Sequence, residues 1–223
     1  MITLTDDLLA IPVSKNNFHK FDLILQNNKL DKYIQHLGLP PPHPSVWQIC
    51  ECESRDHLSD IVKDKDFKER IDAAEHFGFH AGSCSFSADL KTKIFIPTSN
   101  DRVHAMGVFK VGPQPDKAAF HDLVEELAER ILELPAAKKN ILKKTLWFQN
   151  EQIREDLHEL GLPPPEDVVV LMIEAETIEN VVEFIHDAEV ISLVKDTLSH
   201  VPSLLECTCF CADIVAKINK DEA

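Results

Sequence analysis

The sequence has few basic residues for its number of acidic ones. Lys and Arg total 23 against 38 Asp and Glu, which gives a formal net charge of −15 over 223 residues. Phosphate backbones and anionic lipid surfaces repel such a chain. The one basic cluster, formed by Lys138, Lys139, Lys143 and Lys144, is short and follows an acidic segment. We therefore expect neither a nucleic acid nor a membrane as a partner.

Long apolar runs and leader signals are also lacking. No stretch approaches the 18 consecutive apolar residues of a membrane-spanning helix. The opening residues, MITLTDDLLAIP, carry two aspartates and no basic region ahead of the apolar positions, and no Asn-x-Ser/Thr sequon occurs. These features predict a soluble, cytoplasmic protein, and its 44% of hydrophobic residues can form a substantial core.

The spacing of the cysteines does not favour a metal or a disulfide framework. Five of the six fall in C-x-C alternation within apolar runs, at Cys50, Cys52, Cys207, Cys209 and Cys211. Same-face neighbours on a strand lie about 6.6 Å apart, whereas two thiolates on one zinc ion must approach to about 4 Å. We expect small, buried, reduced thiols, no bound metal and no cofactor.

One unusual stretch occurs twice. HLGLPPP at His36–Pro42 and ELGLPPP at Glu159–Pro165 lie 123 positions apart. The same offset aligns Leu23–Asn27 with Leu146–Asn150, and one inserted residue aligns Phe86–Leu90 with Phe210–Ile214. Because Gly ends helices and prolines cannot continue them, each copy predicts a helix stop that leads into the next strand. The chain is thus interpreted as a tandem duplication.

The second copy contains a full set of elements. Apolar spacing and breakers predict strands at 103–111, 142–148, 168–175 and 204–214, and helices at 116–134, 151–160 and from 177, with a second helical segment from Asp187. This order is that of a ferredoxin-like βαββαβ unit. We predict an α+β fold in which residues 1–100 form a first repeat, lacking its first strand and most of its first helix, and residues 101–223 form a complete one. Their antiparallel sheets would pack into an intrachain α+β barrel.

Two segments carry a resemblance to a known family. Phe120-His121-Asp122-Leu123 after the loop KVGPQPD, together with Asp187-Ala188-Glu189-Val190 and the element order, resembles the dimeric α+β barrel superfamily, nearest to its EthD-like and stress-responsive A/B barrel branches. The resemblance implies a small apolar or aromatic ligand in a pocket beside or between the sheets. Activities in the family include cofactor-independent oxygenation, polyketide cyclisation, decarboxylation and dehydration, and some members bind haem.

The missing first strand of the first repeat leaves a place to fill in the sheet. KTKIFIP, at Lys91–Pro97, has no counterpart in the second copy. It can occupy the gap locally or pair with a neighbouring chain, so we expect a homodimer.

Candidate site residues follow from residue type and predicted position. His104 and His121 are candidate general bases, because imidazole titrates near neutrality; the alternative is that both are boundary residues. Candidate ligand-binding residues lie on predicted strands: Trp47, Phe86, Trp147, Phe148, Cys209 and Phe210. They either pack as a solid core or leave a pocket for a flat molecule. Glu51, Glu53, Glu174 and Glu176 are expected to face the positive ends of the following helices; the alternative is a general acid–base or metal-binding role for these paired carboxylates.

Three classes of function are compatible with these residues. The first is a module that binds a small hydrophobic, aromatic or pigment-like molecule. The second is a cofactor-independent cyclase, decarboxylase or monooxygenase that uses His104 or His121 as a base. The third is a stress-related protein without a small ligand.

Overall fold

Seven strands form one antiparallel sheet in the order β2-β1-β7-β4-β6-β5-β3. The computed structural model describes residues 2–35, 39–79, 83–94, 102–111, 116–163, 165, 167–200 and 207–222, and the elements named below lie within these ranges. The strands are β1 (Phe18–Asn27), β2 (Val46–Cys52), β3 (Ser87–Ile94), β4 (Val103–Lys110), β5 (Lys143–Asn150), β6 (Val168–Ala175) and β7 (Thr208–Asn219).

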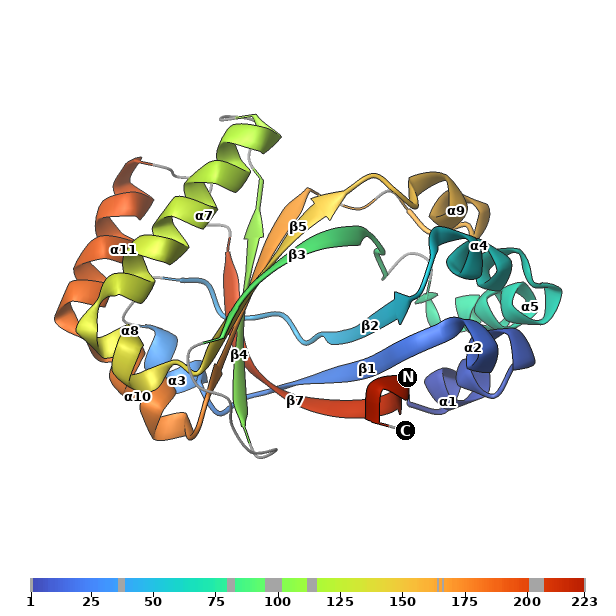
Figure 1. Cartoon of the computed structure of the whole chain (residues 1–223), viewed down its shortest axis with the longest axis horizontal. Helices are drawn as coiled ribbons and strands as arrows, with labels where there is room; N and C mark the ends of the chain where they lie inside the picture. Colours follow the sequence, from blue (N-terminus) through green and yellow to red (C-terminus); the bar gives the residue numbers. More distant parts are fainter. Residues whose placement is uncertain are drawn as a thin grey trace.

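The helices form two groups on opposite sides of the strands (Figure 1). One group consists of α3 (Asp31–Ile34), α7 (Lys117–Glu133), α8 (Pro135–Asn140), α10 (Ile178–His186) and α11 (Ala188–His200). The other consists of α1 (Ile2–Leu9), α2 (Pro12–Asn17), α4 (Arg55–Lys63), α5 (Lys65–Ala73) and α9 (Arg154–Glu159), with 3-10 turns η2 (Ala74–Phe77) and η4 (Lys220–Glu222). The fold is therefore mixed α+β, with a curled antiparallel sheet between two helical groups.

Strands from before and after residue 100 share this sheet. β1 pairs with β7, where Ile24 lies opposite Ile214, and β3 pairs with β5, where Leu90 lies opposite Trp147. We expected two separate sheets face to face, but backbone hydrogen bonds join them edge to edge into a single curled sheet. Such junctions satisfy strand edges that would otherwise be left unpaired.

β2 and β3 are the two edge strands of the sheet, and no strand among the described residues joins one edge to the other. The segment Lys91–Pro97 was expected to fill the place of a missing strand or to pair with a neighbouring chain. Its described residues instead extend β3. Lys91 to Ile94 belong to β3 and pair with β5 across Leu146 to Lys143, and residues 95–97 lie outside the described residues. These four residues therefore do not occupy the place that the sequence predicted to be vacant in the sheet.

Local sequence signals explain most helix boundaries. The expected N-caps each accept a hydrogen bond from the backbone N–H three residues later: Ser54 from His57, Asp64 from Phe67, Thr177 from Asn180 and Asp187 from Val190. These bonds satisfy N–H groups that have no partner inside a helix. Gly161 has a φ of 71° and its N–H bonds the carbonyl of His158, which ends α9 as predicted. The matching Gly38 lies outside the described residues.

Most boundaries differ from the prediction by no more than two residues, and two elements, α9 and β7, differ by more. α9 starts at Arg154 rather than 151. β7 continues beyond Ile214 to Asn219, because β1 runs alongside it and supplies hydrogen-bond partners as far as the pair Lys20–Asn219. Non-local pairing of this kind leaves little trace in the local sequence.

The two faces of the sheet carry different clusters. We call the face that packs against α7, α10 and α11 the outer face. The opposite face of the same strands is the inner face. On the inner face, Met106, Val108, Val170 and Phe210 are buried together with Ile24. β6 is buried at every position except Leu171, which is partly buried, as expected for its continuous apolar run.

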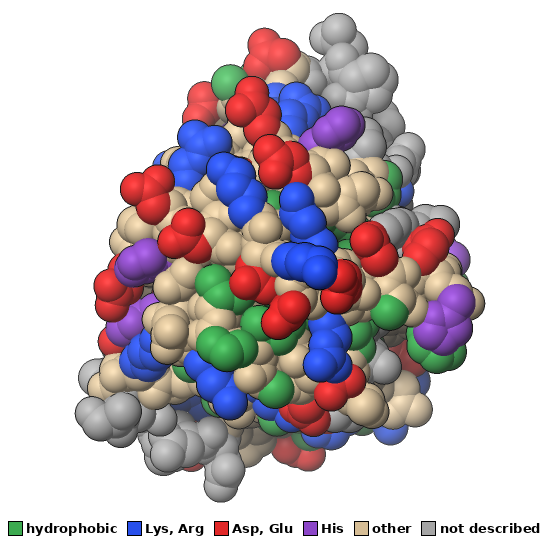
Figure 2. Space-filling view, turned by 90° about the vertical axis from the view of Figure 1, so that its right-hand side faces the viewer, with side chains coloured by type: hydrophobic (Ala, Val, Ile, Leu, Met, Phe, Trp, Pro, Cys, Tyr) green, Lys and Arg blue, Asp and Glu red, His purple; other side chains and the backbone are tan. Residues whose placement is uncertain are grey.

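The end of β7 lies against the first two helices, close to where the chain begins (Figure 1). Lys217 Nζ is 2.9 Å from Asp6 Oδ1, and Lys220 Nζ donates to the carbonyl oxygen of Asn16 at 2.8 Å. On this side of the molecule, acidic and basic side chains alternate over the surface (Figure 2). Such a mixture provides no extended positive field on this face for nucleic acid.

Candidate functional site

A cavity of about 160 Å³ lies between the outer face of the sheet and the helices α7, α10 and α11. We call it the helix–sheet cavity. Strand register sets its floor, because Cys209 of β7, Gly107 of β4 and Leu171 of β6 lie side by side. The helices contribute apolar side chains to its walls, among them Leu127, Ala128, Phe184, Ile185, Val190 and Val194.

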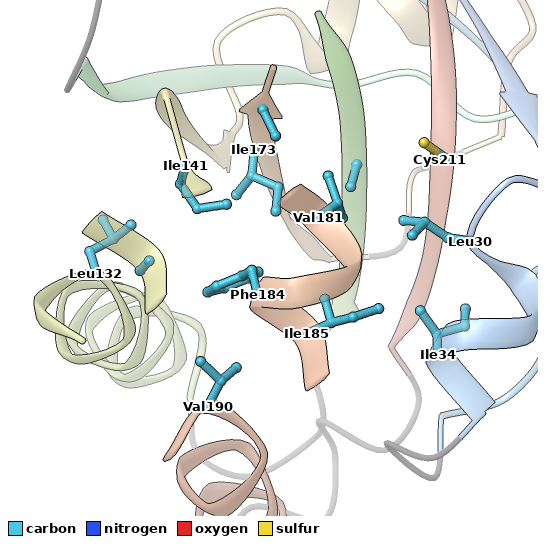
Figure 3. Packing of buried hydrophobic residues seen from close by; sticks show 13 residues of the cluster. Leu30, Ile34, Leu132, Ile141, Ile173, Val181, Phe184, Ile185, Val190 and Cys211 are labelled. Atoms are coloured by element: carbon cyan, nitrogen blue, oxygen red, sulfur yellow. The ribbon is translucent and has the colours of Figure 1, made fainter. Parts of the chain in front are cut away.

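Figure 3 shows how the helices close over the sheet. Leu132 of α7, Phe184 of α10 and Val190 of α11 point toward one another, and Ile141 and Ile173 lie above them in this view. The Asp187 cap explains this arrangement, since it starts a new helix and lets α10 and α11 each turn an apolar face toward the sheet.

Gly107 keeps the floor of the cavity low. A Cβ at this position would lie 3.2 Å from Cε2 of Phe109 and 3.5 Å from Sγ of Cys209. The first distance is closer than ordinary van der Waals contact, so a larger residue would have to displace the Phe109 ring. Gly within a strand often marks such a close approach.

Few polar side chains line the cavity: Lys144, Thr197, Cys207 and Cys209. The Thr197 hydroxyl donates to the carbonyl of Leu193 at 2.9 Å. Contact with Cys207 and burial raise the pKa of Cys209 well above its usual value, so this thiol stays protonated. Lys144 is the one of these four side chains that forms an ion pair.

The Lys144 side chain is only 4% exposed. Its ammonium Nζ lies 2.7 Å from Oε1 of Glu129 on α7, while Lys93 Nζ lies 2.9 Å from the other carboxylate oxygen. The hydrogen bonds from Lys144 and Lys93 hold the pKa of Glu129 below its usual value. Glu129 is therefore ionised at neutral pH and shared between two cations.

A second polar group lies on the inner face of the sheet. His104 of β4, Glu174 of β6 and Lys143 of β5 are register neighbours. Lys143 Nζ lies 2.7 Å from Glu174 Oε1, and Arg102 donates to the other oxygen. We call these four residues the inner polar cluster.

The charge states of the inner polar cluster follow from burial and its partners. Burial alone would raise the pKa of Glu174, but hydrogen bonds from Lys143 and Arg102 outweigh it and hold the pKa below its usual value. Burial lowers the pKa of His104, against the raising effect of the Glu174 charge. At neutral pH the cluster therefore combines an ionised Glu174 with a neutral imidazole that can accept a proton.

The structure divides the predicted ligand-binding residues between the two faces. Trp47, Phe86, Trp147 and Phe210 belong to the inner-face cluster. Phe148 packs under α7 with Phe120 and Val124, and Cys209 lines the helix–sheet cavity. Phe210 also borders this cavity. The six residues thus do not form one site.

The two predicted histidines lie apart as well. His104 belongs to the inner polar cluster, whereas His121 on α7 lies outside the helix–sheet cavity, with its ring 5.0 Å from that of Phe148. Burial and the nearby Lys117 ammonium lower the pKa of His121. Its Nε2 is buried and has no hydrogen-bond partner among the residues that the structure describes.

Two of the four glutamates expected at helix ends, Glu51 and Glu174, form ion pairs on the sheet. Glu174 binds Lys143 and Arg102, and Glu51 lies 3.6 Å from Lys20 Nζ. Neighbouring strands place these lysines directly opposite the carboxylates, Lys20 beside Glu51 and Lys143 beside Glu174. The thiols also differ in part from expectation, since Cys50 and Cys84 are exposed whereas Cys207 and Cys211 are buried.

The basic cluster seen in the sequence is fully paired with glutamates. Lys138 pairs with Glu133, Lys139 with Glu183, Lys143 with Glu174 and Lys144 with Glu129. Strand alternation sends Lys143 and Lys144 to opposite faces of β5. Lys144 and Gly107 were missed as site residues: one looked like a surface charge, and a single glycine in a strand is a weak signal.

No metal or membrane feature appears in the described part of the chain. Within it, no group of three or more His, Cys, Asp or Glu side chains is arranged to hold a metal ion. Among the described helices, none has the length and apolar content needed to cross a membrane.

Comparison with known proteins shows similarity of structure alone. No family model and no curated protein sequence matches the chain. An anthrone oxidase-like protein of known structure superposes with a TM-score of 0.53 at 12% identity, covering 94% of this chain and 97% of that one. At this identity the likeness concerns the fold alone.

Two proposed monooxygenases of known structure are less similar. The protein from Fusobacterium nucleatum gives a TM-score of 0.49 at 12% identity, covering 97% of this chain and 87% of that one. The protein from Lactobacillus acidophilus gives 0.42 at 8% identity, covering 90% and 96%.

Proposed function

We propose that the protein binds a small apolar molecule, preferentially a single aromatic ring, in the helix–sheet cavity. The observation that carries this proposal is an almost wholly apolar space of about 160 Å³ inside a packed helix–sheet interface. Apolar cavities of about 150 Å³ in proteins admit benzene. Close packing normally leaves few voids larger than a water molecule, so a space of this size suits a ligand.

Sequence features that keep the cavity open support this function. Gly107 holds the floor low beneath Phe109, and Ala105 and Ala128 place small side chains on its floor and wall. Larger apolar residues at Ala105 and Ala128 would fill the space and gain stability through burial, and a larger residue at Gly107 would push the Phe109 ring. The combination of small residues in an otherwise large-residue core favours a bound molecule.

The experiment uses 4-fluorotoluene as a neutral, ring-sized probe observed by fluorine NMR. Val194→Phe extends a cavity-lining side chain of α11 into the space, while Val215→Phe makes the same change at a 39% exposed position on β7. We expect the probe to bind the wild type and the Val215 variant and to lose binding in the Val194 variant. Equal binding by all three proteins, or none by the wild type, would contradict the proposal.

A second candidate function is a cofactor-independent oxidase or monooxygenase centred on the inner polar cluster. Two observations favour it: the structural likeness to an anthrone oxidase-like protein, and a partly buried His104 whose pKa is lowered by burial. A neutral imidazole accepts the proton of an acidic C–H group, and the carbanion is then oxidised by dioxygen. For anthrone the balanced change is anthrone plus O₂ to anthraquinone plus water.

Oxygen uptake with anthrone tests this second function. His104→Asn should abolish any turnover above the background rate, and His121→Asn, which alters the other candidate base, should leave it unchanged. Turnover that survives the loss of His104 would rule out its role as the base.

We propose that the chain belongs to the dimeric α+β barrel superfamily, on an EthD-like or stress-responsive A/B branch, and arose by duplication of a ferredoxin-like unit. The matched caps Ser54 and Thr177, and Asp64 and Asp187, support this origin. So do Pro12 and Pro135, each of which opens a short helix that leads into a strand.

A further inference from the structure

Lys144 places a buried positive charge at one side of the helix–sheet cavity. Its side chain lines the space and is 4% exposed, so the ammonium is almost removed from water. Burying an ammonium is costly unless it is paired and hydrogen-bonded. The hydrogen-bond and ion-pair partners of the Lys144 ammonium therefore determine which head group a ligand in the cavity can carry.

Glu129 only partly meets the needs of this ammonium. An ammonium carries three donors, and the Lys144 ammonium has one hydrogen-bond partner among the described residues, the Oε1 atom of Glu129 at 2.7 Å. That carboxylate is also engaged by Lys93 at 2.9 Å and is itself 44% exposed. Two donors of a buried cation thus remain for another acceptor.

The other polar side chains that line the cavity have little effect on an acceptor bound to Lys144. Thr197 is bonded within α11. Cys209 stays protonated because Cys207 and burial raise its pKa. Neither Thr197 nor Cys209 would repel an anion. Cys207 is the remaining polar side chain beside Lys144, and its hydrogen bond with Cys209 lowers its pKa. The other lining side chains are apolar.

The position of Lys144 also defines the orientation of a bound molecule. Lys144 lies on β5, opposite Ile173 of β6, which in turn lies opposite Ala105 of β4. Neighbouring strands lie about 4.8 Å apart, so apolar floor extends roughly 10 Å from Lys144 toward β4. A ring fits over Ile173 and Ala105 while a head group at its edge meets the ammonium.

We infer that the helix–sheet cavity takes a small apolar carboxylate, with Lys144 binding its carboxylate head and the apolar walls holding its body. This inference rests on the proposed binding function and specifies the class of ligand. Carboxylic acids titrate near pH 4, so such a ligand is ionised at neutral pH. Its carboxylate offers the Lys144 ammonium a second acceptor beside Glu129.

The test compares 4-fluorobenzoate with 4-fluorotoluene by fluorine NMR, because the two probes share a ring and differ in the head group. In the wild type we expect the carboxylate to bind more tightly. Lys144→Met keeps the length of the side chain and removes its charge, so carboxylate affinity should fall about ten- to a hundredfold, as expected for one charge-assisted contact. Affinity for 4-fluorotoluene should stay within about twofold by the same scale.

A matched control and a second variant complete the test. Lys91→Met removes another strand-to-α7 ion pair, with Glu125 at 2.5 Å, that does not line the cavity, and should change neither affinity. Glu129→Gln frees the Lys144 ammonium from its anionic partner and should raise carboxylate affinity. It provides an independent result if Lys144→Met folds poorly.

The outcomes separate the two proposals. If both probes bind but Lys144→Met and Glu129→Gln leave carboxylate affinity unchanged, the role of Lys144 is overturned while the binding function stands. If 4-fluorotoluene binds and 4-fluorobenzoate does not, the ligand is neutral and the inference is wrong. If neither probe binds the wild type, both proposals are overturned.

Discussion

The indole ring of Trp47 packs against that of Trp147, with 6.5 Å between the ring centroids and 70° between the planes. Trp47 lies on the edge strand β2, and Trp147 lies on β5, next to the opposite edge strand. Trp47 also meets Phe86 at 6.4 Å. Side chains thus bring the two ends of the sheet together where the described residues provide no strand to join them by hydrogen bonds.

This contact predicts that Trp47 stabilises the curled sheet. Trp47→Ala removes both aromatic contacts, and because the side chain is half-buried we expect a loss of about 2–3 kcal/mol, below the 3–5 kcal/mol typical of fully buried aromatic residues. Urea unfolding measures the change. The neighbouring Val46→Ala, at a 43% exposed side chain, is the control and should change stability by less than about 0.5 kcal/mol. Equal effects of the two changes would show that the aromatic contact does not hold the edges.

The buried ion pairs of Glu174 predict a stability that depends on pH. Glu174→Gln leaves Lys143 and Arg102 without their anion and should cost about 3–5 kcal/mol at pH 7, as for other broken buried pairs. Because the folded-state pKa of Glu174 is lowered, its contribution is complete above the unfolded pKa of about 4.3 and disappears as the pH falls through the folded value.

Urea unfolding of both proteins from pH 7 down to pH 3 measures this dependence. The difference between wild type and Glu174→Gln should narrow below about pH 4. If the difference in unfolding free energy between the two proteins stays constant from pH 7 to pH 3, Lys143 and Arg102 do not set the titration of Glu174.

Local signals in the sequence predicted the helices better than the sheet. Caps such as Thr177 and Asp187, the apolar stripe of α7 and the proline that opens α8 all act within a few residues, so they can be read directly. The pairing of β1 with β7 joins residues almost 200 positions apart. No local pattern encodes that register, and a single curled sheet was therefore not foreseen.

The candidate site was harder to predict for a related reason. Strand alternation decides which face a residue occupies, and the sequence does not say which face a ligand uses. Trp147 and Phe148 are neighbours in the chain yet belong to clusters on opposite faces of β5. The helix–sheet cavity depends on Gly107 and Lys144, whose roles become visible only when α7 is placed over the sheet.

The environment of His104 predicts the direction of its titration. Burial lowers its pKa, and the negative charge of Glu174 opposes this effect. Wild-type His104 should therefore titrate below the ordinary value of about 6.5, and Glu174→Gln should lower the pKa further. Because the unfolded state binds this proton more readily, His104 makes the protein less stable as the pH falls below about 6.5.

Proton NMR of the imidazole ring follows this titration, with His104→Asn used to assign the resonance. A rise in the pKa of His104 in Glu174→Gln would show that the carboxylate is not its dominant neighbouring charge.

Gly107 predicts a change in ligand affinity without a matching change in stability. In Gly107→Ala the new methyl group would lie 3.2 Å from the Phe109 ring, and such overpacking costs about 1 kcal/mol or more. Replacing Gly within a strand gains about 0.5–1 kcal/mol of backbone entropy, so the two effects nearly cancel. The methyl group nevertheless occupies the floor of the cavity, and affinity for 4-fluorotoluene should fall roughly tenfold, the effect of losing about 1.4 kcal/mol of binding energy. Ala105→Gly, which enlarges the same floor, should instead improve binding of the larger 1-fluoronaphthalene. Parallel losses of stability and affinity in Gly107→Ala would indicate that the glycine serves packing and not the ligand.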